Sequence, residues 1–391
     1  MSLASVDRST GSAHFKPLDG LRGIAILLVI VHHAYHHVAH DPVSRALTFI
    51  SGAGWIGVTL FFSLSGFLIG GILMDAVGKP HWYRGFFARR SLRIFPLYFT
   101  FLIVYWFVLA RLKWTRYAAP HPVGNDAAVF WVYLANMREL IVGRGVTVPA
   151  LDPLWSLSVE EQVYVLLPFL IWLCPFNRLG KLLAGVFVSS VIWKLGCAAL
   201  RAGIEPRYAW LPACIDAFAA GAMIAWMSRH PQWRERVGSI ATPVARGAGL
   251  FILGIGMGNG GLIFWDNPLL LLSVGTIALA VFFGGWIGVI VSRDESTLMN
   301  RMLSARWLRW CGQYSYAAYL FHATIIALLQ PHFGVFDHRT GFASLPRAIG
   351  FTAAVGVISF MAARLSWELL EKHFIALKRY FPAASHVVRA D

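Results

Sequence analysis

Ten apolar runs, each close to the length that crosses a lipid bilayer, divide this chain of 391 residues. A transmembrane helix needs about 20 mainly apolar residues, and its backbone groups must pair internally because lipid offers them no partners. The runs lie approximately at 18–38, 54–74, 94–111, 154–174, 181–200, 208–228, 247–264, 268–291, 311–330 and 348–370. Only 14% of the residues are charged, whereas a soluble domain carries about 25%. These features predict an all-α polytopic membrane protein in which about ten transmembrane helices form a single bundle.

The seventh run differs from the others because it contains the glycine-rich stretch GIGMGNGG at 254–261. Glycine inside a helix costs about 1 kcal/mol relative to alanine. We therefore expect a broken or shortened helix at this position.

The basic residues of the chain indicate its orientation. Ten spans place both termini on one side, and most lysines and arginines fall in the segments that share that side. Cytoplasmic segments carry the excess of positive charge in membrane proteins. We expect both termini to be cytoplasmic, with tails at 1–17 and 374–391 around a membrane domain at 18–373 in the cell inner membrane. The net charge of +15 is explained by basic residues that orient the chain in the membrane and contact anionic lipids. No nucleic-acid partner is therefore expected.

The first apolar run carries a cation and several imidazoles. Arg22 and His33 are eleven residues apart, about 16 Å along a helix and on the same face. Ionisable groups in a membrane span are expensive and indicate function. The neighbouring histidines, whose roles the sequence leaves open, are His32, His36, His37 and His40. A metal site is an alternative for them, but the helix offers no acidic partner at ligand spacing, and no metal is expected.

A basic cluster, FFARRSLRIFP at 86–96, precedes the third run. Arg90 and Arg93 are three residues apart and share a helix face. Arginine forks suit phosphate oxygens, but anchoring to lipid headgroups explains the same pattern. The residues alone leave both interpretations open.

Three further stretches place polar side chains in apolar runs. Glu160 and Glu161 begin the fourth run and point in different directions; one of them suits the orientation of a catalytic base, or both stabilise the helix N-terminus. Ser65, in a run rich in small residues, either permits close helix packing or lines a cavity. His322, in the ninth run, taken alone is a structural histidine.

Taken together, these stretches resemble membrane acyltransferase family 3, the polytopic O-acyltransferases of bacterial surface glycans. The motifs are LDGLRG, with Asp19 and the R-x10-H pair Arg22 and His33, then GVTLFFSLSGFLI, RRSLRIFPLY, LWSLSVEEQVY and YSYAAYLFH. They occur in the family's order over 18–373. Two positions, Ser63 and Val163, depart from the usual residues without disturbing the polar motifs. Many relatives carry a C-terminal hydrolase-like domain, which we do not expect here.

The resemblance implies an acyl-CoA donor, with acetyl-CoA expected, and a sugar hydroxyl of an exported or surface glycan or glycolipid as acceptor. By family position, Arg22, Arg90 and Arg93 bind the donor, His33 and Glu160 are catalytic, and Asp19, Ser65 and His322 are further candidates. His33 is expected to act as general base with Glu160 holding its imidazole, or His33 or Ser65 carries a transient acyl group. Membrane lipids and glycan-assembly proteins are the expected partners. The alternative is a proton-coupled transporter, which also suits intramembrane histidine and arginine.

Overall fold

The computed structural model describes residues 15–36, 41–109, 125–143, 148–259, 261–262, 267–333, 336–337, 341–342 and 344–381. Nine helical segments of these ranges are long and apolar enough to cross a membrane. Their main helices are α1 (Lys16–Ala34), α3 (Ile56–Ala76), α4 (Trp82–Val104), α7 (Leu154–Leu173), α8 (Phe176–Ala199), α10 (Leu211–Arg229), α11 (Val237–Gly258), α13 (Thr276–Ser292) and α17 (Leu345–Ser366). The all-α polytopic fold predicted above is confirmed.

Shorter elements connect or extend these helices. The short α-helices are α2 (Pro42–Gly52), α5 (Asn125–Trp131), α6 (Arg138–Val142), α9 (Ile204–Tyr208), α12 (Pro268–Leu270), α14 (Leu298–Leu303), α15 (Arg306–Gln313), α16 (Ser315–Leu329) and α18 (Lys372–Ala376). The π and 3-10 turns are η1 (Tyr105–Leu109), η2 (Ala135–Met137), η3 (Arg234–Arg236), η4 (Leu271–Gly275), η5 (Gln330–His332), η6 (Trp367–Glu371) and η7 (Leu377–Tyr380). A two-residue antiparallel pair, β1 (Phe336–Asp337) and β2 (Gly341–Phe342), precedes α17.

Three helix boundaries differ from the sequence prediction. The run at 311–330 is divided at Tyr314 into α15 and α16, and α16 has only 15 residues. The helix expected to be broken or shortened at 254–261 is shortened there, because α11 ends at Gly258 instead of reaching 264. It still runs through Gly254 and Gly256, because unpaired backbone groups in lipid cost more than the weak helix propensity of glycine. Helix α4 begins at Trp82, which places its arginine cluster within a helix.

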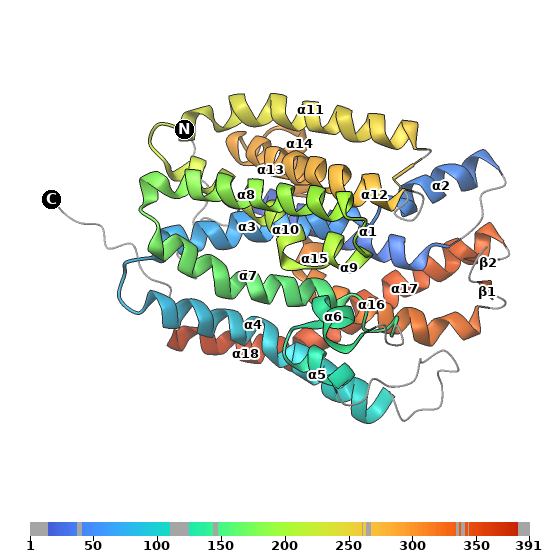
Figure 1. Cartoon of the computed structure of the whole chain (residues 1–391). Helices are drawn as coiled ribbons and strands as arrows, with labels where there is room; N and C mark the ends of the chain where they lie inside the picture. Colours follow the sequence, from blue (N-terminus) through green and yellow to red (C-terminus); the bar gives the residue numbers. More distant parts are fainter. Residues whose placement is uncertain are drawn as a thin grey trace.

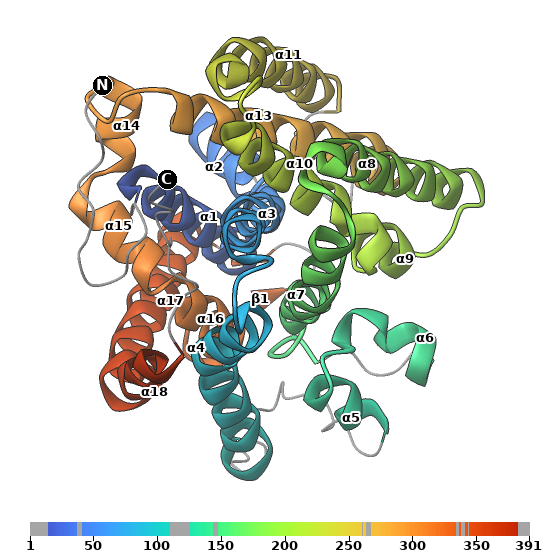
Figure 2. The ribbon, with the colours of Figure 1, turned by 90° about the vertical axis from the view of Figure 1, so that its left-hand side faces the viewer.

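The long helices lie side by side as one bundle (Figure 1). Viewed from one end, α3 lies near the middle of the bundle and α11 at its margin (Figure 2). Burial agrees with this arrangement: 72% of the apolar window containing α3 is buried, against 22% for the windows of α8 and α11. The outer faces of α8 and α11 are therefore the surfaces available to lipid.

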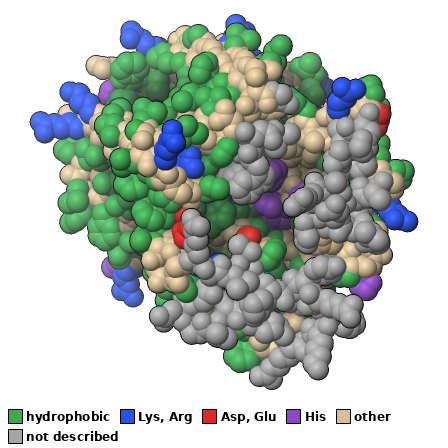
Figure 3. All heavy atoms as spheres, turned by 45° about the vertical axis from the view of Figure 1, so that its right-hand side comes forward, with side chains coloured by type: hydrophobic (Ala, Val, Ile, Leu, Met, Phe, Trp, Pro, Cys, Tyr) green, Lys and Arg blue, Asp and Glu red, His purple; other side chains and the backbone are tan. Residues whose placement is uncertain are grey.

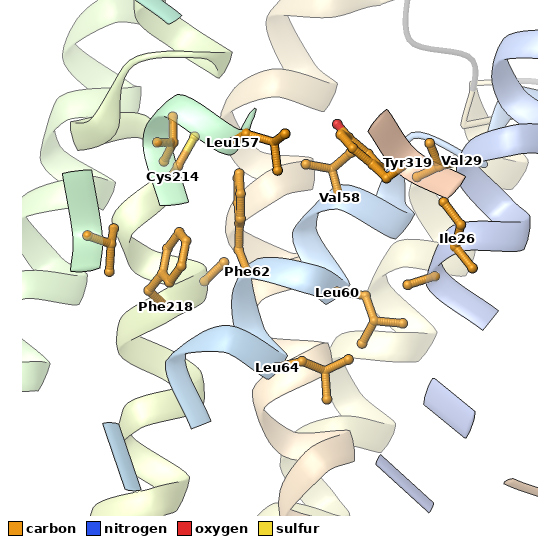
Figure 4. Packing of buried hydrophobic residues seen from close by; sticks show 14 of the residues in the cluster. Ile26, Val29, Val58, Leu60, Phe62, Leu64, Leu157, Cys214, Phe218 and Tyr319 are labelled. Carbon is orange, nitrogen blue, oxygen red and sulfur yellow. The ribbon is translucent and has the colours of Figure 1, made fainter. Parts of the chain in front are cut away.

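Helices α3 and α10 pack with their backbones in close contact. A Cβ atom on Gly66 of α3 would lie 2.0 Å from the Phe218 carbonyl oxygen, and one on Gly221 of α10 would lie 1.9 Å from that of Ser63. Phe62 stacks on Phe218 next to this contact, with ring centroids 4.7 Å apart (Figure 4). Small residues that permit backbone approach are the usual basis of helix association in membranes.

We expect Gly221→Ala to destabilise the protein by roughly 1–3 kcal/mol, because the added methyl group must separate α10 from α3. The measurement is the thermal unfolding midpoint in detergent. Gly254→Ala on α11 is the matched control, because its Cβ would have no neighbour within 4 Å. Equal midpoints for the two variants would contradict the close packing of α3 and α10.

Candidate active site

A cavity of about 730 Å³ lies inside the helix bundle. It is lined by residues of α1, α3, α4, α7, α15 and α16 and of the C-terminal stretch from η6 to η7. Six of the eight residues predicted from the sequence line it: Asp19, Arg22, Ser65, Arg90, Arg93 and Glu160. The other two, His33 and His322, do not line it, and His322 contacts the lining residue Tyr319.

Close contact between α1 and α15 brings two arginines to this cavity. A Cβ atom on Gly312 of α15 would lie 1.9 Å from the Asp19 carbonyl oxygen of α1, so only glycine allows this approach. Arg22 of α1 and Arg309 of α15 both line the cavity as a result. The Nε atom of each is buried and has no hydrogen-bond partner among the residues that the structure describes. Buried polar atoms are normally paired, so these two donors indicate a ligand.

The sequence analysis missed three basic residues of the cavity: Arg306, Arg309 and Lys378. A detectable signal existed for the first two, because Arg306 and Arg309 repeat the three-residue spacing of Arg90 and Arg93. Lys378 lies in the stretch expected to be a cytoplasmic tail, and nothing in its neighbourhood marked it. The described part of this stretch is helical as far as Tyr380, and Lys378 of η7 lines the cavity.

Glu160 is bound within the cavity by two hydroxyl groups. Ser65 Oγ donates to Glu160 Oε1 at 2.7 Å, and Tyr164 OH donates to the same oxygen. The Arg90 guanidinium lies 5.5 Å from the centre of the Tyr164 ring. No hydrogen bond joins Glu160 to His33 among the described residues. Tyr164 was also missed, although its position four residues after Glu160 places both on one helix face.

The partner of His33 is the other predicted histidine. His322 Nε2 lies 3.3 Å from His33 Nδ1, and the ring centroids are 5.0 Å apart. The two residues are 289 positions apart in the sequence. His322 is fully buried, whereas His33 is half-buried. The lone structural histidine of the sequence interpretation is therefore one member of a pair.

The backbone contacts of the pair assign its protons. His33 Nδ1 lies 2.9 Å from the Val29 carbonyl oxygen, and His322 Nδ1 lies 2.6 Å from that of Tyr319. A carbonyl oxygen only accepts, so each Nδ1 carries a hydrogen. In the neutral rings, both Nε2 atoms then hold lone pairs. The single hydrogen on His33 Nδ1 is shared between the Val29 carbonyl oxygen and the lone pair of His322 Nε2. The lone pair of His33 Nε2 can take a proton from another molecule.

Tyr319 separates the histidine pair from the cavity. Its side chain lines the cavity, and its ring centroid lies 5.4 Å from that of His322. Its hydroxyl group lies 2.6 Å from Ser156 Oγ and donates to the Pro153 carbonyl oxygen at 3.2 Å. The polar end of the cavity thus lies one helical turn from His322.

Histidine side chains reach the surface on the face of the molecule drawn in Figure 3. His36 is exposed, and His32 Nδ1 donates to the Ser51 carbonyl oxygen of α2 at 2.9 Å. His37 and His40 lie outside the described residues. Within the ranges that the structure describes, no group of three or more histidine, cysteine or acidic residues is arranged to hold a metal ion.

The fold and site define a polytopic membrane protein with a basic internal cavity that ends next to a histidine pair. A family model described as an acyltransferase domain, acyltransferase family 3, matches residues 15–364. The chain belongs to this acyltransferase family, which confirms the resemblance found in its motifs.

Curated relatives are similar over much of this chain. Peptidoglycan O-acetyltransferase OatA of Listeria monocytogenes is 26% identical over 371 residues, which cover 90% of this chain and 54% of OatA. YrhL of Bacillus subtilis, a candidate peptidoglycan O-acetyltransferase, is 26% identical over 80% of this chain and 49% of its own length. BcsY of Komagataeibacter xylinus, a candidate membrane-bound transacylase, is 29% identical over 60% of this chain and 58% of its own. The chain thus spans about half the length of these relatives. No solved structure matches it significantly.

Proposed function

We propose that this protein transfers an acetyl group from acetyl-CoA to a sugar hydroxyl of an exported glycan, with His33 as general base. The observation that carries the proposal is the cavity itself. Six basic side chains line it, and its other end lies next to a paired histidine. Such an arrangement suits a reactant with several phosphates at one end and a reactive group at the other.

The charges of the cavity favour CoA as the donor. The basic side chains are Arg22, Arg90, Arg93, Arg306, Arg309 and Lys378, against three carboxylates, Asp19, Glu160 and Glu371. None of the six forms an ion pair with another described residue, whereas the buried Lys194 pairs with Asp216 and Arg229 pairs with Asp75. Guanidinium groups form strong charge-assisted bonds to phosphate oxygens. The pantetheine arm is long enough to cover the roughly 16 Å between Arg22 and His33 along α1.

The transfer step follows from the proton positions. The acceptor oxygen attacks the thioester carbonyl carbon while His33 Nε2 takes the hydroxyl proton. The carbon–sulfur bond then breaks, and His33 returns the proton to the departing sulfur. The products are the O-acetyl ester and free CoA. His322 supports the step because its Nε2 lone pair faces the Nδ1–H of the imidazolium that forms on His33.

Glu160 has a positioning role in this proposal. Its carboxylate holds Ser65 and Tyr164 on the wall of the cavity, beside Arg90. A variant of the mechanism passes the acetyl group through Ser65, whose hydroxyl is polarised by the same carboxylate. Isolation of an acetylated enzyme after quenching would distinguish the two routes.

The basic residues of the cavity are proposed to lie toward the cytoplasm, where acyl-CoA is available, and the histidine pair toward the outside. The acceptor class is proposed from the relatives, because OatA is named for O-acetylation of peptidoglycan. Membrane lipids and glycan-assembly proteins remain its proposed partners. The loop at 112–153, described at 125–143 and 148–153, is proposed to help select the acceptor.

The test uses purified protein in proteoliposomes with radiolabelled acetyl-CoA and a mixed cell-envelope glycan preparation. We expect label to appear in the glycan as an alkali-labile ester, with release of CoA in equal amount. A protein that binds no acetyl-CoA, or that moves solutes without releasing CoA, would contradict the proposal and favour a transporter.

Replacement of His322 by glutamine tests the histidine pair. A hydrogen bond to a charged group contributes roughly 1.5–3 kcal/mol, so we expect kcat to fall roughly 10- to 100-fold. The affinity for acetyl-CoA should stay unchanged, because His322 lies outside the cavity lining. His230→Gln, at the stack with Phe176, is the control. A rise in the KM for acetyl-CoA with unchanged kcat would show that His322 only shapes the cavity.

A further inference from the structure

Tyr319 connects the cavity to the histidine pair. Its side chain lines the cavity, and its ring centroid lies 5.4 Å from that of His322. Its carbonyl oxygen also accepts the hydrogen of His322 Nδ1, at 2.6 Å. His322 in turn lies 3.3 Å from His33, and neither histidine lines the cavity. The Tyr319 ring therefore stands between the space that holds a ligand and the proposed catalytic base.

Residues of two other helices hold this ring in place. Tyr319 is buried and belongs to the hydrophobic cluster drawn in Figure 4. Its hydroxyl group lies 2.6 Å from Ser156 Oγ of α7 and donates to the carbonyl oxygen of Pro153, the residue before α7, at 3.2 Å. Phe61 of α3, which also lines the cavity, meets the ring edge to face with centroids 6.2 Å apart. Displacing the ring would leave a buried hydroxyl group without partners, which is costly.

The fixed ring limits the space for the acyl group of the donor. In the transfer step proposed above, the thioester carbonyl carbon must reach the acceptor oxygen beside His33 Nε2. Aromatic rings with centroids 5.4 Å apart are in direct contact, so no chain passes between Tyr319 and His322. An acetyl group carries only a methyl group beyond its carbonyl carbon. A longer acyl group must place further methylene groups against this contact.

We propose that Tyr319 determines the acyl specificity of the protein: its ring, fixed by Ser156 and Pro153, admits an acetyl group to the histidine pair and excludes longer acyl groups. This inference rests on the proposed function. The basic residues that are proposed to bind the phosphates of CoA do not depend on the length of the acyl group. The selection therefore acts on the rate of transfer, whereas the affinity for the thioester stays similar for acetyl-CoA and butyryl-CoA.

The test is a competition between equal concentrations of acetyl-CoA and butyryl-CoA, with the full chain in proteoliposomes and the mixed glycan preparation as acceptor. Alkali releases the esters, and mass spectrometry measures the ratio of acetate to butyrate. We expect the wild-type protein to favour acetyl by at least about 100-fold, because each methylene group without space costs roughly 10- to 200-fold. Tyr319→Ala removes the ring and should lower this ratio at least about tenfold.

Two further variants complete the test. Tyr319→Phe keeps the ring but loses the hydrogen bonds that fix it, and should lower the ratio roughly two- to tenfold, as for the loss of one neutral hydrogen bond. Tyr83→Ala is the matched control, because this tyrosine of α4 is exposed and does not line the cavity. Its ratio should equal that of the wild type. Both esters are measured in one sample, so a smaller amount of folded protein does not change the ratio.

The outcomes separate this specificity from the proposed function. If the wild-type protein transfers neither group, the proposed function is wrong. If it transfers acetyl and butyryl equally, the proposed function stands and the role of Tyr319 is wrong. An unchanged ratio in Tyr319→Ala also overturns that role, and an unchanged ratio in Tyr319→Phe does so if the alanine variant fails to fold. If calorimetry shows that butyryl-CoA does not bind the wild-type protein, longer donors are excluded from the cavity itself, and the proposal is overturned.

Discussion

Replacement of His33 by alanine is expected to reduce the rate of acetyl transfer by at least about 100-fold, because a general base contributes roughly 10²- to 10⁴-fold to catalysis. His33 Nε2 carries the lone pair of the histidine pair that is free to take a proton. His322 cannot replace it, because its own Nε2 faces His33. The measurement is kcat for transfer of labelled acetyl groups to glycan in proteoliposomes. Binding of CoA should persist, because His33 lies outside the lining of the cavity.

Two observations keep this prediction testable. The unfolding midpoint of the His33→Ala protein should remain close to that of the wild type, which shows that the loss is chemical. His332→Ala is the matched control, because this histidine is exposed in η5 at the end of α16. Retained transfer by the His33→Ala protein would remove His33 from the mechanism and would favour a route through Ser65.

Replacement of Arg22 by alanine is expected to weaken the binding of CoA roughly 10- to 100-fold, as for loss of one charge-assisted bond to phosphate. Arg22 Nε has no hydrogen-bond partner among the described residues, so its removal breaks no hydrogen bond of this nitrogen there. The measurement is the dissociation constant of CoA by calorimetry. The unfolding midpoint without CoA should change little, whereas the increase of this midpoint on addition of CoA should be smaller than in the wild type.

Arg84→Ala serves as the control for Arg22. Arg84 is an exposed residue of α4 that does not line the cavity. Its replacement by alanine removes the same charge as the replacement of Arg22. Normal CoA binding by the Arg22→Ala protein would make Arg22 a structural residue of α1. Equal weakening in both variants would indicate a general effect of net charge instead of a contact.

The sequence predicted the positions of the membrane helices wherever the length of the apolar run alone determines the helix. The spans expected at 154–174 and 208–228 correspond closely to α7 and α10. Errors arose where another factor competed. The third run was expected to begin at 94, but α4 begins at Trp82, and Arg90 and Arg93 face a polar cavity instead of lipid. The glycines of 254–261 indicated a broken or shortened helix, and α11 does end among them, at Gly258.

For the site, the local motifs identified the residue types and the tertiary structure decided their partners. Arg90 and Arg93 share a helix face by spacing alone, and both line the cavity. The expected contact of Glu160 with His33 does not occur in the structure, where Ser65 and Tyr164 occupy the carboxylate. Nothing in the sequence near Lys378 marked it as part of this cavity.

The sequence by itself determined a polytopic helical membrane protein. The backbone groups of ten long apolar runs must form hydrogen bonds within the protein in lipid, and transmembrane helices achieve this. It also identified the basic and histidine motifs as candidate functional residues. Ionisable groups are costly inside a membrane and therefore indicate function. Only the tertiary structure decided that His33 pairs with His322 and that residues of α15 and η7 join the arginines of α1 and α4. The physical reason is that these contacts depend on how the helices cross and approach, through glycines such as Gly312, and helix periodicity carries no information about that packing.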